Sequence, residues 1–365
     1  MDAARLRAAF PVLQHTAYLN AGTGGPIPEA ARRAAIAAWQ LGTEEGRGGR
    51  FHERVGKLAD GLRERYASLL QAAPTDVALT TGTSDGCGRV VAGLSLGRGD
   101  EILTADDEHP GLQGPLVAAR QQRDVTIRAV PLEELPGAIG PQTRLVACSH
   151  VSWHSGAIVD VAALTAAAGD LPVLLDGAQG VGAIGLDVRS LGVSFYTGSG
   201  QKWLCGPVGC GMLWVDPRWQ ERLAATVPGH VNLADPAAGL ASPLWPDARR
   251  FDAGSLDIST FAAATAAFDV LAEDGWAAVH DRAARLAAEL AEALRGDGHA
   301  VVARGPSTLV SWAAGDDAAA EARRDALAQR GIVIRALPGT GRLRASVGAW
   351  NDEDDLRRLR DALRA

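Results

Sequence analysis

The most informative part of the sequence is Leu174-Leu175-Asp176-Gly177-Ala178-Gln179, followed downstream by Gly198-Ser199-Gly200-Gln201-Lys202-Trp203. In the first stretch an acid ends an apolar run that predicts a strand, and in the second a lysine lies between small residues and a tryptophan. Polar groups at the carboxyl ends of parallel strands meet at one edge of a sheet. The two stretches therefore predict an active site at that edge.

Asp176 and Lys202 match the requirements of pyridoxal 5'-phosphate (PLP). This cofactor withdraws electrons only while its ring nitrogen stays protonated, which a carboxylate enforces, and it is held as a Schiff base on a lysine. Asp176 would be the ring partner and Lys202 the anchor, whose pKa an apolar pocket lowers from its usual ~10.4. Taken singly, Asp176 could instead close a turn, and Lys202 could be an ordinary surface lysine.

Length and composition bound the class of protein. A chain of 365 residues suggests two domains, or one large α/β domain with a smaller appendage. Its hydrophobic content of 47% and charged content of 22% are typical of a globular protein. Its net charge of −7 does not favour binding to nucleic acid or to anionic membranes. We expect its partners to be small molecules and further copies of the chain.

The N-terminus and the cysteines indicate the compartment. Met1-Asp2-Ala3-Ala4-Arg5 does not resemble a secretory signal, and no apolar run approaches the ~20 residues of a membrane span, which predicts a cytoplasmic protein. The four cysteines of so long a chain do not predict a disulfide framework. Cys205 and Cys210 lack a second Cys or His pair nearby, so we expect no metal site.

Apolar runs alternate with helical patterns along the first 225 residues, which predicts a mainly parallel seven-stranded sheet covered by helices. The expected strands are Val77-Thr81, Glu101-Ala105, Val125-Val130, Arg144-Ser149, Pro172-Asp176, Val193-Thr197 and Val208-Val215. The expected helices are Pro28-Gln40, His52-Leu70, Ser84-Leu94, Gly111-Gln121 and Val161-Gly169.

The last third of the chain predicts a smaller α+β domain after a proline-rich stretch. Its expected helices are Thr260-Glu273, Trp276-Arg295, Ala318-Arg330 and Asp352-Leu363. Its expected strands are Ala300-Val302, Thr308-Ser311, Ile332-Arg335 and Leu343-Val347.

Polar clusters follow five of the expected strands, and such an edge is where open parallel sheets bind ligands. They are Gly82-Thr83-Ser84, Asp107-Glu108-His109, Ser152-Trp153-His154, Asp176-Gly177-Ala178-Gln179 and Ser199-Gly200-Gln201-Lys202. Gly82-Thr83-Ser84 also opens a helix, where backbone N–H groups could hold a phosphate, although plain N-capping would use the same residues.

One motif points elsewhere. Gly180-Val181-Gly182-Ala183-Ile184-Gly185 matches the G-x-G-x-x-G of dinucleotide-binding proteins, but it does not begin directly after its strand and no acid follows about 20 residues later. We therefore regard a nicotinamide enzyme as an outside alternative.

The chain resembles the class V branch of fold-type I PLP enzymes, which includes cysteine desulfurases, carbon-sulfur lyases, isopenicillin N epimerase-like proteins and some aminotransferases. The resemblance runs from Tyr18-Leu19-Asn20-Ala21-Gly22 to Asn351-Asp352-Glu353, and its centre is Asp-x-x-Gln with Ser-Gly-Gln-Lys-Trp-Leu-x-Gly-Pro-x-Gly. It implies an N-terminal segment over residues 1–25, a large PLP-binding domain over 26–257 and a small C-terminal domain over 258–365.

The resemblance also implies roles for single residues. Lys202 would carry the Schiff base, Asp176 would contact the ring nitrogen, Gln179 the phenolic oxygen, and His109 would stack on the ring. The phosphate would be held by Gly82, Thr83, Ser84, Ser199 and Gln201, and by Ser255 of the neighbouring subunit of a homodimer. The substrate would contact Asn20, Trp153 and Arg344, with its carboxylate on the Arg344 fork.

Departures from the family pattern narrow the activity. Cysteine desulfurases carry a histidine before the lysine, where this chain has Gln201, and an asparagine where it has Trp153. They also need a loop cysteine to accept sulfur as a persulfide, whereas this region is Ala336-Leu337-Pro338-Gly339-Thr340-Gly341. A persulfide-relay desulfurase is therefore disfavoured.

The resemblance implies an amino-acid substrate that reacts through an external aldimine and an α-carbanion, with Lys202 as general base. We expect β-elimination, that is, a carbon-sulfur lyase acting on cysteine, a cysteine conjugate or its sulfoxide. An aminotransferase or an amino-acid epimerase remains the alternative. A regulatory binding module is a weaker one, because such a module would be expected to have lost Lys202 or Arg344.

Overall fold

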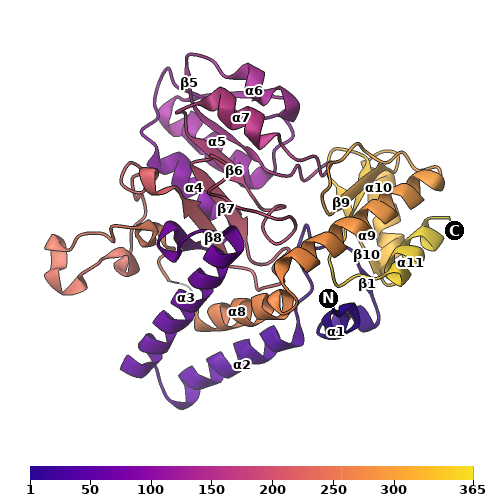
Figure 1. Ribbon diagram of the computed structural model, residues 1–365, viewed down its shortest axis with the longest axis horizontal. Coiled ribbons are helices and arrows are strands. Elements are labelled where there is room, and N and C mark those ends of the chain that lie inside the picture. The colour runs from indigo at the N-terminus through magenta and orange to yellow at the C-terminus, as the bar shows by residue number, and fades with distance from the viewer. Residues whose placement is uncertain (256, 365) are drawn as a thin grey trace.

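The computed structural model describes residues 1–255 and 257–364, and its main feature there is a seven-stranded sheet (Figure 1). In their order across the sheet, its strands are β2 (Val77–Thr80), β8 (Gly211–Val215), β7 (Phe195–Ser199), β6 (Val173–Asp176), β5 (Thr143–Ser149), β3 (Glu101–Ala105) and β4 (Thr126–Val130). Strand β8 runs antiparallel to both of its neighbours, and the other pairs are parallel. The predicted mainly parallel seven-stranded sheet is confirmed.

Helices cover both faces of this sheet, because its strands are apolar on both sides. In β6, for example, Leu174 packs in the core beneath one face and Leu175 in the core beneath the other. The first core includes residues of α4 (Thr83–Gly93) and α5 (Pro110–Arg123). The second core includes residues of α3 (Gly49–Leu70), α7 (Val161–Ala168) and α8 (Ile258–Ala272).

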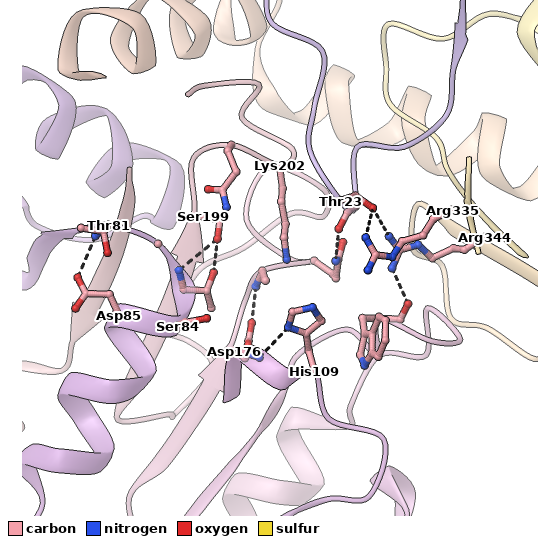
Figure 2. A pocket seen from close by; sticks show the side chains of 18 residues that line it. Thr23, Thr81, Ser84, Asp85, His109, Asp176, Ser199, Lys202, Arg335 and Arg344 are labelled. Carbon is pink, nitrogen blue, oxygen red and sulfur yellow. Dashed lines mark hydrogen bonds between the residues drawn. The ribbon is translucent and has the colours of Figure 1, made fainter. Parts of the chain in front are cut away.

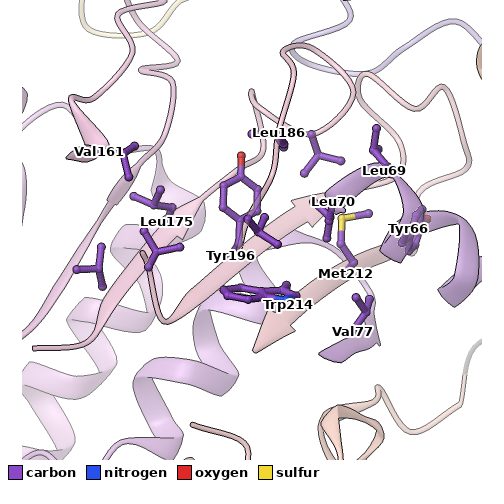
Figure 3. Close-up of a cluster of buried hydrophobic side chains, with 14 of the residues drawn as sticks. Tyr66, Leu69, Leu70, Val77, Val161, Leu175, Leu186, Tyr196, Met212 and Trp214 are labelled. Atoms are coloured by element: carbon purple, nitrogen blue, oxygen red, sulfur yellow. The ribbon is translucent and has the colours of Figure 1, made fainter. Parts of the chain in front are cut away.

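The second core surrounds the aromatic side chains of the central strands. Figure 3 shows Tyr196 of β7 and Trp214 of β8 among aliphatic side chains such as Leu70 and Leu175. Helix α2 (Glu29–Glu44) lies outside this core and packs along α8, whereas the short α6 (Leu135–Ala138) packs on α7 and contributes Leu135 to the core. The strand ends that carry the predicted polar clusters thus extend from strands packed on both faces.

A smaller part of the structure contains two more sheets. One has the order β11 (Arg335–Leu337), β12 (Arg342–Ser346) and β9 (Leu309–Ala313), all antiparallel, and the other pairs β1 (Ala17–Tyr18) with β10 (Ile332–Val333) in parallel. The helices of this part are α9 (Trp276–Gly296), α10 (Asp317–Gln329) and α11 (Glu353–Arg364). They share one core with β9 and β12, which includes Trp312 and Leu343.

The N-terminal segment joins this smaller part to the large sheet. It begins with α1 (Ala3–Ala8), pairs through β1 with β10, and then runs toward the loop after β7, where the Gly25 N–H donates to the Gln201 carbonyl (2.8 Å). Residues 20–25 are therefore held beside the carboxyl edge of the large sheet. Among the described helices, none is both long and apolar enough to cross a membrane.

Two expected strands differ from the structure. Ala300-Val302 forms no strand, and only Val301 makes an isolated bridge, with Trp312. Ile332-Arg335 divides into β10 and β11, because Ile332 and Val333 pair with the N-terminal strand whereas Arg335 pairs with β12. The strand β1 itself has only two residues and was not predicted. The proposed division at residue 258 stays a prediction, and α8 packs on the large core.

A buried ion pair connects α3, β2 and the segment that precedes α8. Both terminal nitrogens of Arg63 donate to the Asp252 carboxylate (2.9 and 2.8 Å), and the Leu79 N–H donates to the same group (2.8 Å). The side chains of this pair are only 7% and 12% exposed. Removing one partner leaves the other charge buried and unpaired.

We expect Asp252→Ala to lower the free energy of unfolding by about 3–5 kcal/mol, because Arg63 would keep its buried charge without a carboxylate. Urea unfolding followed by circular dichroism measures this change. The matched control is Glu53→Ala, which removes an exposed partner of Lys57 and should leave the unfolding midpoint unchanged. Equal midpoints for the two variants would contradict the assignment.

Candidate active site

A pocket of about 320 Å³ lies at the carboxyl edge of the large sheet, where the N-terminal segment and the β11–β12 hairpin approach it. It is lined by Gly22, Thr23, Thr81, Gly82, Thr83, Ser84, Asp85, His109, Gly111, Trp153, Asp176, Ala178, Gln179, Ser199, Gln201, Lys202, Arg335 and Arg344. Figure 2 shows Lys202 pointing into it, with Asp176 and His109 beneath in that view.

Asp176 is the last residue of β6 and is buried. From the described residues, its carboxylate receives one hydrogen bond, from the Ala178 N–H (2.8 Å). Burial raises the pKa of Asp176, and the positive charge of Lys202 partly opposes that shift. A buried carboxylate with so few donors is stabilised by a cationic partner in the pocket.

Lys202 lies three residues after the end of β7, in a turn that the N-terminal segment contacts. Loss of hydration lowers the pKa of Lys202 to about 8, whereas the negative charge of Asp176 acts in the opposite direction. The positive charges of Arg344 and Arg335 lower it further. The amine is therefore partly unprotonated near neutral pH, as a nucleophile or a general base requires.

One end of the pocket is formed by the start of α4. Thr83 opens this helix after Gly82, whose φ of 153° lies in the region that favours glycine. The Thr83 N–H donates to Ser199 Oγ (3.3 Å), and the hydroxyls of the two residues lie 2.5 Å apart. Hydroxyls gathered at a helix N-terminus suit an anion. Asp85 does not oppose this, because its carboxylate accepts from the Thr81 N–H (3.0 Å) and from Arg89 (2.9 Å).

His109 and Trp153 form a wall of the pocket. The Gly111 N–H donates to His109 Nδ1 (3.0 Å), which places the ring proton of the neutral imidazole on Nε2. Burial, with a smaller effect of Lys202, lowers the pKa of His109 to about 4. The ring is therefore neutral at physiological pH. Trp153 lies edge-on to it with the ring centroids 5.0 Å apart, and its indole N–H donates to the Asp107 carbonyl (2.9 Å).

The other end of the pocket contains two arginines. Arg344 donates to the Trp153 carbonyl (2.8 Å) and to Thr23 Oγ1 (3.3 Å), and Arg335 donates to the same Thr23 oxygen (3.3 Å). Burial, with the nearby charge of Arg335, lowers the pKa of Arg344 to about 9. Gly22 permits the approach, since a Cβ there would lie 2.9 Å from an Arg344 nitrogen.

Gln179 is fixed between the N-terminal segment and the loop after β7. Its amide nitrogen donates to the Gly22 carbonyl (2.8 Å), and its amide oxygen accepts from the Trp203 indole N–H (2.9 Å). The Gln201 side-chain oxygen is buried without a hydrogen-bond partner among the described residues.

Most of the residues singled out from the sequence line this pocket. They are Gly82, Thr83, Ser84, His109, Trp153, Asp176, Gln179, Ser199, Gln201, Lys202 and Arg344. Asn20 does not line it and instead bridges Ser346. Ser255 is exposed and borders a different hollow of this chain.

Sequence reasoning missed Thr23 and Arg335. Thr23 directly follows a stretch that carried the family resemblance, but nothing in its spacing predicts a pocket residue. Arg335 ends an expected strand, and only the register of β11 on β12 aligns it with Arg344. The available signal was that two arginines flank a short turn-forming segment of glycine and proline.

Comparison of the sequence with known proteins shows the family of this chain. The family model described as Aminotransferase class-V matches residues 40–359. The chain belongs to the class V aminotransferase family. Its relatives include the isopenicillin N epimerase of Streptomyces clavuligerus, 31% identical over 292 residues that cover 72% of this chain and 71% of that protein. A probable cysteine desulfurase of Pseudomonas aeruginosa is 33% identical over 340 residues, which cover 84% of this chain and 82% of that protein.

The fold of this class V enzyme is also that of solved structures. A mutant of C-DES, with glycine covalently linked to the PLP cofactor, superposes with a TM-score of 0.92 at 26% identity over 98% of both chains. C-DES in complex with its product cysteine persulfide, described as a cystine C-S lyase, superposes with a TM-score of 0.91 at 26% identity over 97% of this chain and 98% of that one. The chain is a fold-type I, PLP-dependent class V enzyme that is similar to cysteine desulfurases and to this cystine C-S lyase.

The pocket of this class V enzyme fits PLP. It offers an amine of lowered pKa at Lys202, a buried carboxylate at Asp176, and hydroxyls at the start of α4 for a phosphate. The unpartnered oxygen of Gln201 is a further polar atom that the described residues leave free. These groups match in kind the three contacts that the cofactor needs, to its aldehyde, its ring nitrogen and its phosphate.

We expect the amine of Lys202 in cofactor-free protein to react with an amine-selective reagent with a pH midpoint near 8, since loss of hydration lowers its pKa. Reactivity should rise as the pH passes through that value, because only the uncharged amine attacks. Peptide mapping after brief reductive methylation at a series of pH values measures this midpoint.

The variant Asp176→Asn should lower the midpoint of Lys202 further, because the carboxylate charge favours the ammonium form. Nα-acetyl-lysine in the same reaction gives the reference near ~10.4. A midpoint for Lys202 equal to that of the reference would contradict the description of the pocket.

Proposed function

We propose that this enzyme is a carbon-sulfur lyase that eliminates the sulfur group from cysteine, a cysteine conjugate or its sulfoxide, without a persulfide on the protein. The observation that carries the proposal is the hairpin between β11 and β12. Only residues 338–341 separate these strands, and they include no cysteine. Asp317 fixes the turn by accepting from the Gly339 and Gly341 N–H groups (2.6 and 2.7 Å).

The remaining cysteines give no alternative acceptor for sulfur. All four are buried, and none of them lines the pocket. Burial raises the pKa of each thiol, which disfavours the nucleophilic thiolate. A sulfur relay through this chain is therefore disfavoured, and the sulfur group would leave with the product.

Lys202 is the proposed anchor of PLP, and the small number of lysines in the sequence supports this assignment. The sequence contains two lysines, Lys57 and Lys202. Lys57 lies on the exposed surface of α3 in an ion pair with Glu53, away from the pocket. When bound, PLP supplies the electron sink that stabilises negative charge at the substrate Cα. Asp176 would keep the ring nitrogen protonated, and Gln179 would donate to the phenolic oxygen.

The other proposed roles follow from position. Thr83, Ser84 and Ser199, with Gly82 and Gln201, would hold the phosphate at the start of α4. The neutral ring of His109 would lie against the cofactor ring, and Trp153 would close the substrate side. Arg344 would hold the α-carboxylate, and the free Nζ of Lys202 would then take the proton from Cα. The role of Asn20 as a substrate contact stays a prediction.

The overall reaction balances without an oxidant. An S-substituted cysteine loses the Cα proton and its Cβ–S bond breaks, with the electron pair leaving on sulfur as a thiolate that takes up a proton. Water then releases the remaining three-carbon unit as pyruvate and ammonia. The protein must therefore move one proton at Lys202 Nζ and provide no redox equivalents.

An epimerase is the second candidate, since a 31% identical relative is an isopenicillin N epimerase. Epimerisation begins with the same proton removal but returns the proton to the opposite face of Cα. In the described part of the pocket, the wall formed by His109 and Trp153 offers only a neutral imidazole and an indole. Neither group is acidic enough to return a proton to Cα. Elimination does not need such a group, and we therefore favour the lyase.

We also propose a homodimer in which Ser255 reaches the phosphate of the neighbouring site. Ser255 borders a hollow of about 1580 Å³ between α2, α3 and the segments around residues 230 and 255, which is also lined by Trp39 (64% exposed) and the half-buried Phe51. A large hollow lined by aromatic side chains supports a contact with a second copy.

We expect purified enzyme reconstituted with PLP to release pyruvate from S-substituted L-cysteines, and Lys202→Ala to lower this rate by roughly 10²- to 10⁴-fold or more. Lys57→Ala is the matched control and should retain full activity. Borohydride reduction should attach the cofactor to the peptide that contains Lys202.

Three results would contradict the lyase. Amino-group transfer to an added keto acid would identify an aminotransferase. Exchange of Cα hydrogen with loss of optical activity, without pyruvate, would identify an epimerase. Attachment of the cofactor to Lys57 would overturn the site itself.

The dimer is tested by mixing two inactive variants, Lys202→Ala and Ser255→Asp, because each mixed dimer would contain one site with both native residues. Activity should return to about a quarter of the wild-type value after the subunits exchange. No recovery, in a mixture that light scattering shows to be dimeric, would mean that Ser255 serves its own subunit or neither.

A further inference from the structure

The β11–β12 hairpin places two arginines side by side. Arg335 and Arg344 are direct partners in its antiparallel register, so their side chains leave the same face of the sheet. Both line the active-site pocket. Like charges directly opposite each other on neighbouring strands are destabilising. Such a pair therefore requires compensation from a ligand.

The protein itself does not neutralise this pair. Within residues 1–255 and 257–364, neither arginine forms a salt bridge, and the Nε of each is buried without a hydrogen-bond partner. Their terminal nitrogens donate to neutral oxygens, of Thr23 and of the Trp153 backbone. Arg344 is only 1% exposed, which makes its unpaired charge costly.

The cofactor phosphate does not account for the two positive charges. In Figure 2, Thr23, Arg335 and Arg344 lie on one side of Lys202, whereas Thr81, Ser84 and Asp85 at the start of α4 lie on the other. One α-carboxylate can bind one guanidinium through two parallel hydrogen bonds. The second guanidinium then remains without an anion.

The two arginines also differ in depth. Arg344 is fully buried, Arg335 is half-buried, and the Thr23 side of the pocket is exposed. A substrate whose α-carboxylate reaches the deeper arginine would extend its side chain toward the shallower one. The side-chain end of the substrate would therefore lie near Arg335 and the mouth of the pocket.

We propose that Arg335 is a specificity-determining residue which selects amino acids with an acidic group at the end of the side chain, while Arg344 holds the α-carboxylate. The proposal rests on the proposed function, and within it the preferred substrate is a cysteine whose sulfur substituent ends in a carboxylate. Uncharged cysteine conjugates would leave Arg335 uncompensated and would bind more weakly.

A binding experiment on the PLP-loaded enzyme tests this selection without turnover. Glutarate, with two carboxylates, and butyrate, with one, contain no amine or sulfur and cannot react. Isothermal titration calorimetry should find that glutarate binds roughly tenfold to a hundredfold more tightly than butyrate. Arg335→Gln should abolish this preference and leave butyrate binding unchanged, whereas Arg344→Gln should weaken both ligands.

Two further variants serve as controls. Arg335→Lys keeps the charge without the planar fork and should retain part of the preference. Arg342→Gln removes an arginine of the same hairpin that does not line the pocket, and should change neither affinity. Circular dichroism of each variant reports whether the hairpin and its sheet still fold.

Equal affinity for the two ligands in the wild type, or equal weakening of both by Arg335→Gln, would overturn the proposal, because Arg335 would then share the α-carboxylate. Turnover gives a second readout with an isosteric pair. S-carboxymethyl-L-cysteine should have a lower KM than S-carbamoylmethyl-L-cysteine, and Arg335→Gln should remove the difference. If neither compound is cleaved, the lyase fails, whereas the calorimetric preference still decides the role of Arg335.

Discussion

The buried carboxylate of Asp176 is the constraint on which the rest of the active site depends. It lies at the end of a central strand whose two faces are both covered by hydrophobic cores, where an ionised acid is unfavourable without a cationic partner. Its one hydrogen bond from the described residues and the nearby amine of Lys202 compensate it only in part. A protonated ring nitrogen would complete the compensation, which explains why PLP suits this position.

The same desolvation prepares Lys202. The pocket that makes an ionised Asp176 unfavourable also disfavours the ammonium form of the lysine, so its pKa falls to about 8 while the carboxylate opposes the shift. The charge of each group thus favours the ionised form of the other, and this opposes the effect of burial on both. Groups that suit anions flank them on either side, with hydroxyls and a helix N-terminus at one end and two guanidinium groups at the other. The phosphate of PLP and the carboxylate of an amino-acid substrate would each find a suitable partner at one of these two ends.

Sequence reasoning succeeded where local pattern and sheet geometry agree. The seven strands of the large sheet were predicted within a few residues, because apolar runs bounded by turns identify buried parallel strands. It failed at Ala300-Val302, which has the composition of a strand but forms only a single bridge. It also merged β10 with β11, since one extended segment can pair with two different strands and only the surrounding core decides where it divides.

From the sequence alone, one could already tell which strand ends bring polar groups to the pocket. Asp176, Lys202 and the hydroxyls after β2 and β7 each follow a strand, and parallel strands necessarily bring their carboxyl ends to one edge. The far end of the pocket, where Thr23 and Arg335 join Arg344, became visible only in the tertiary structure. These residues come from the N-terminal segment and from a hairpin more than three hundred positions later, so their meeting depends on the pairing of β1 with β10 and on the register of β11 with β12. Long-range pairing of this kind is set by packing against a common core, which no local pattern in the chain encodes.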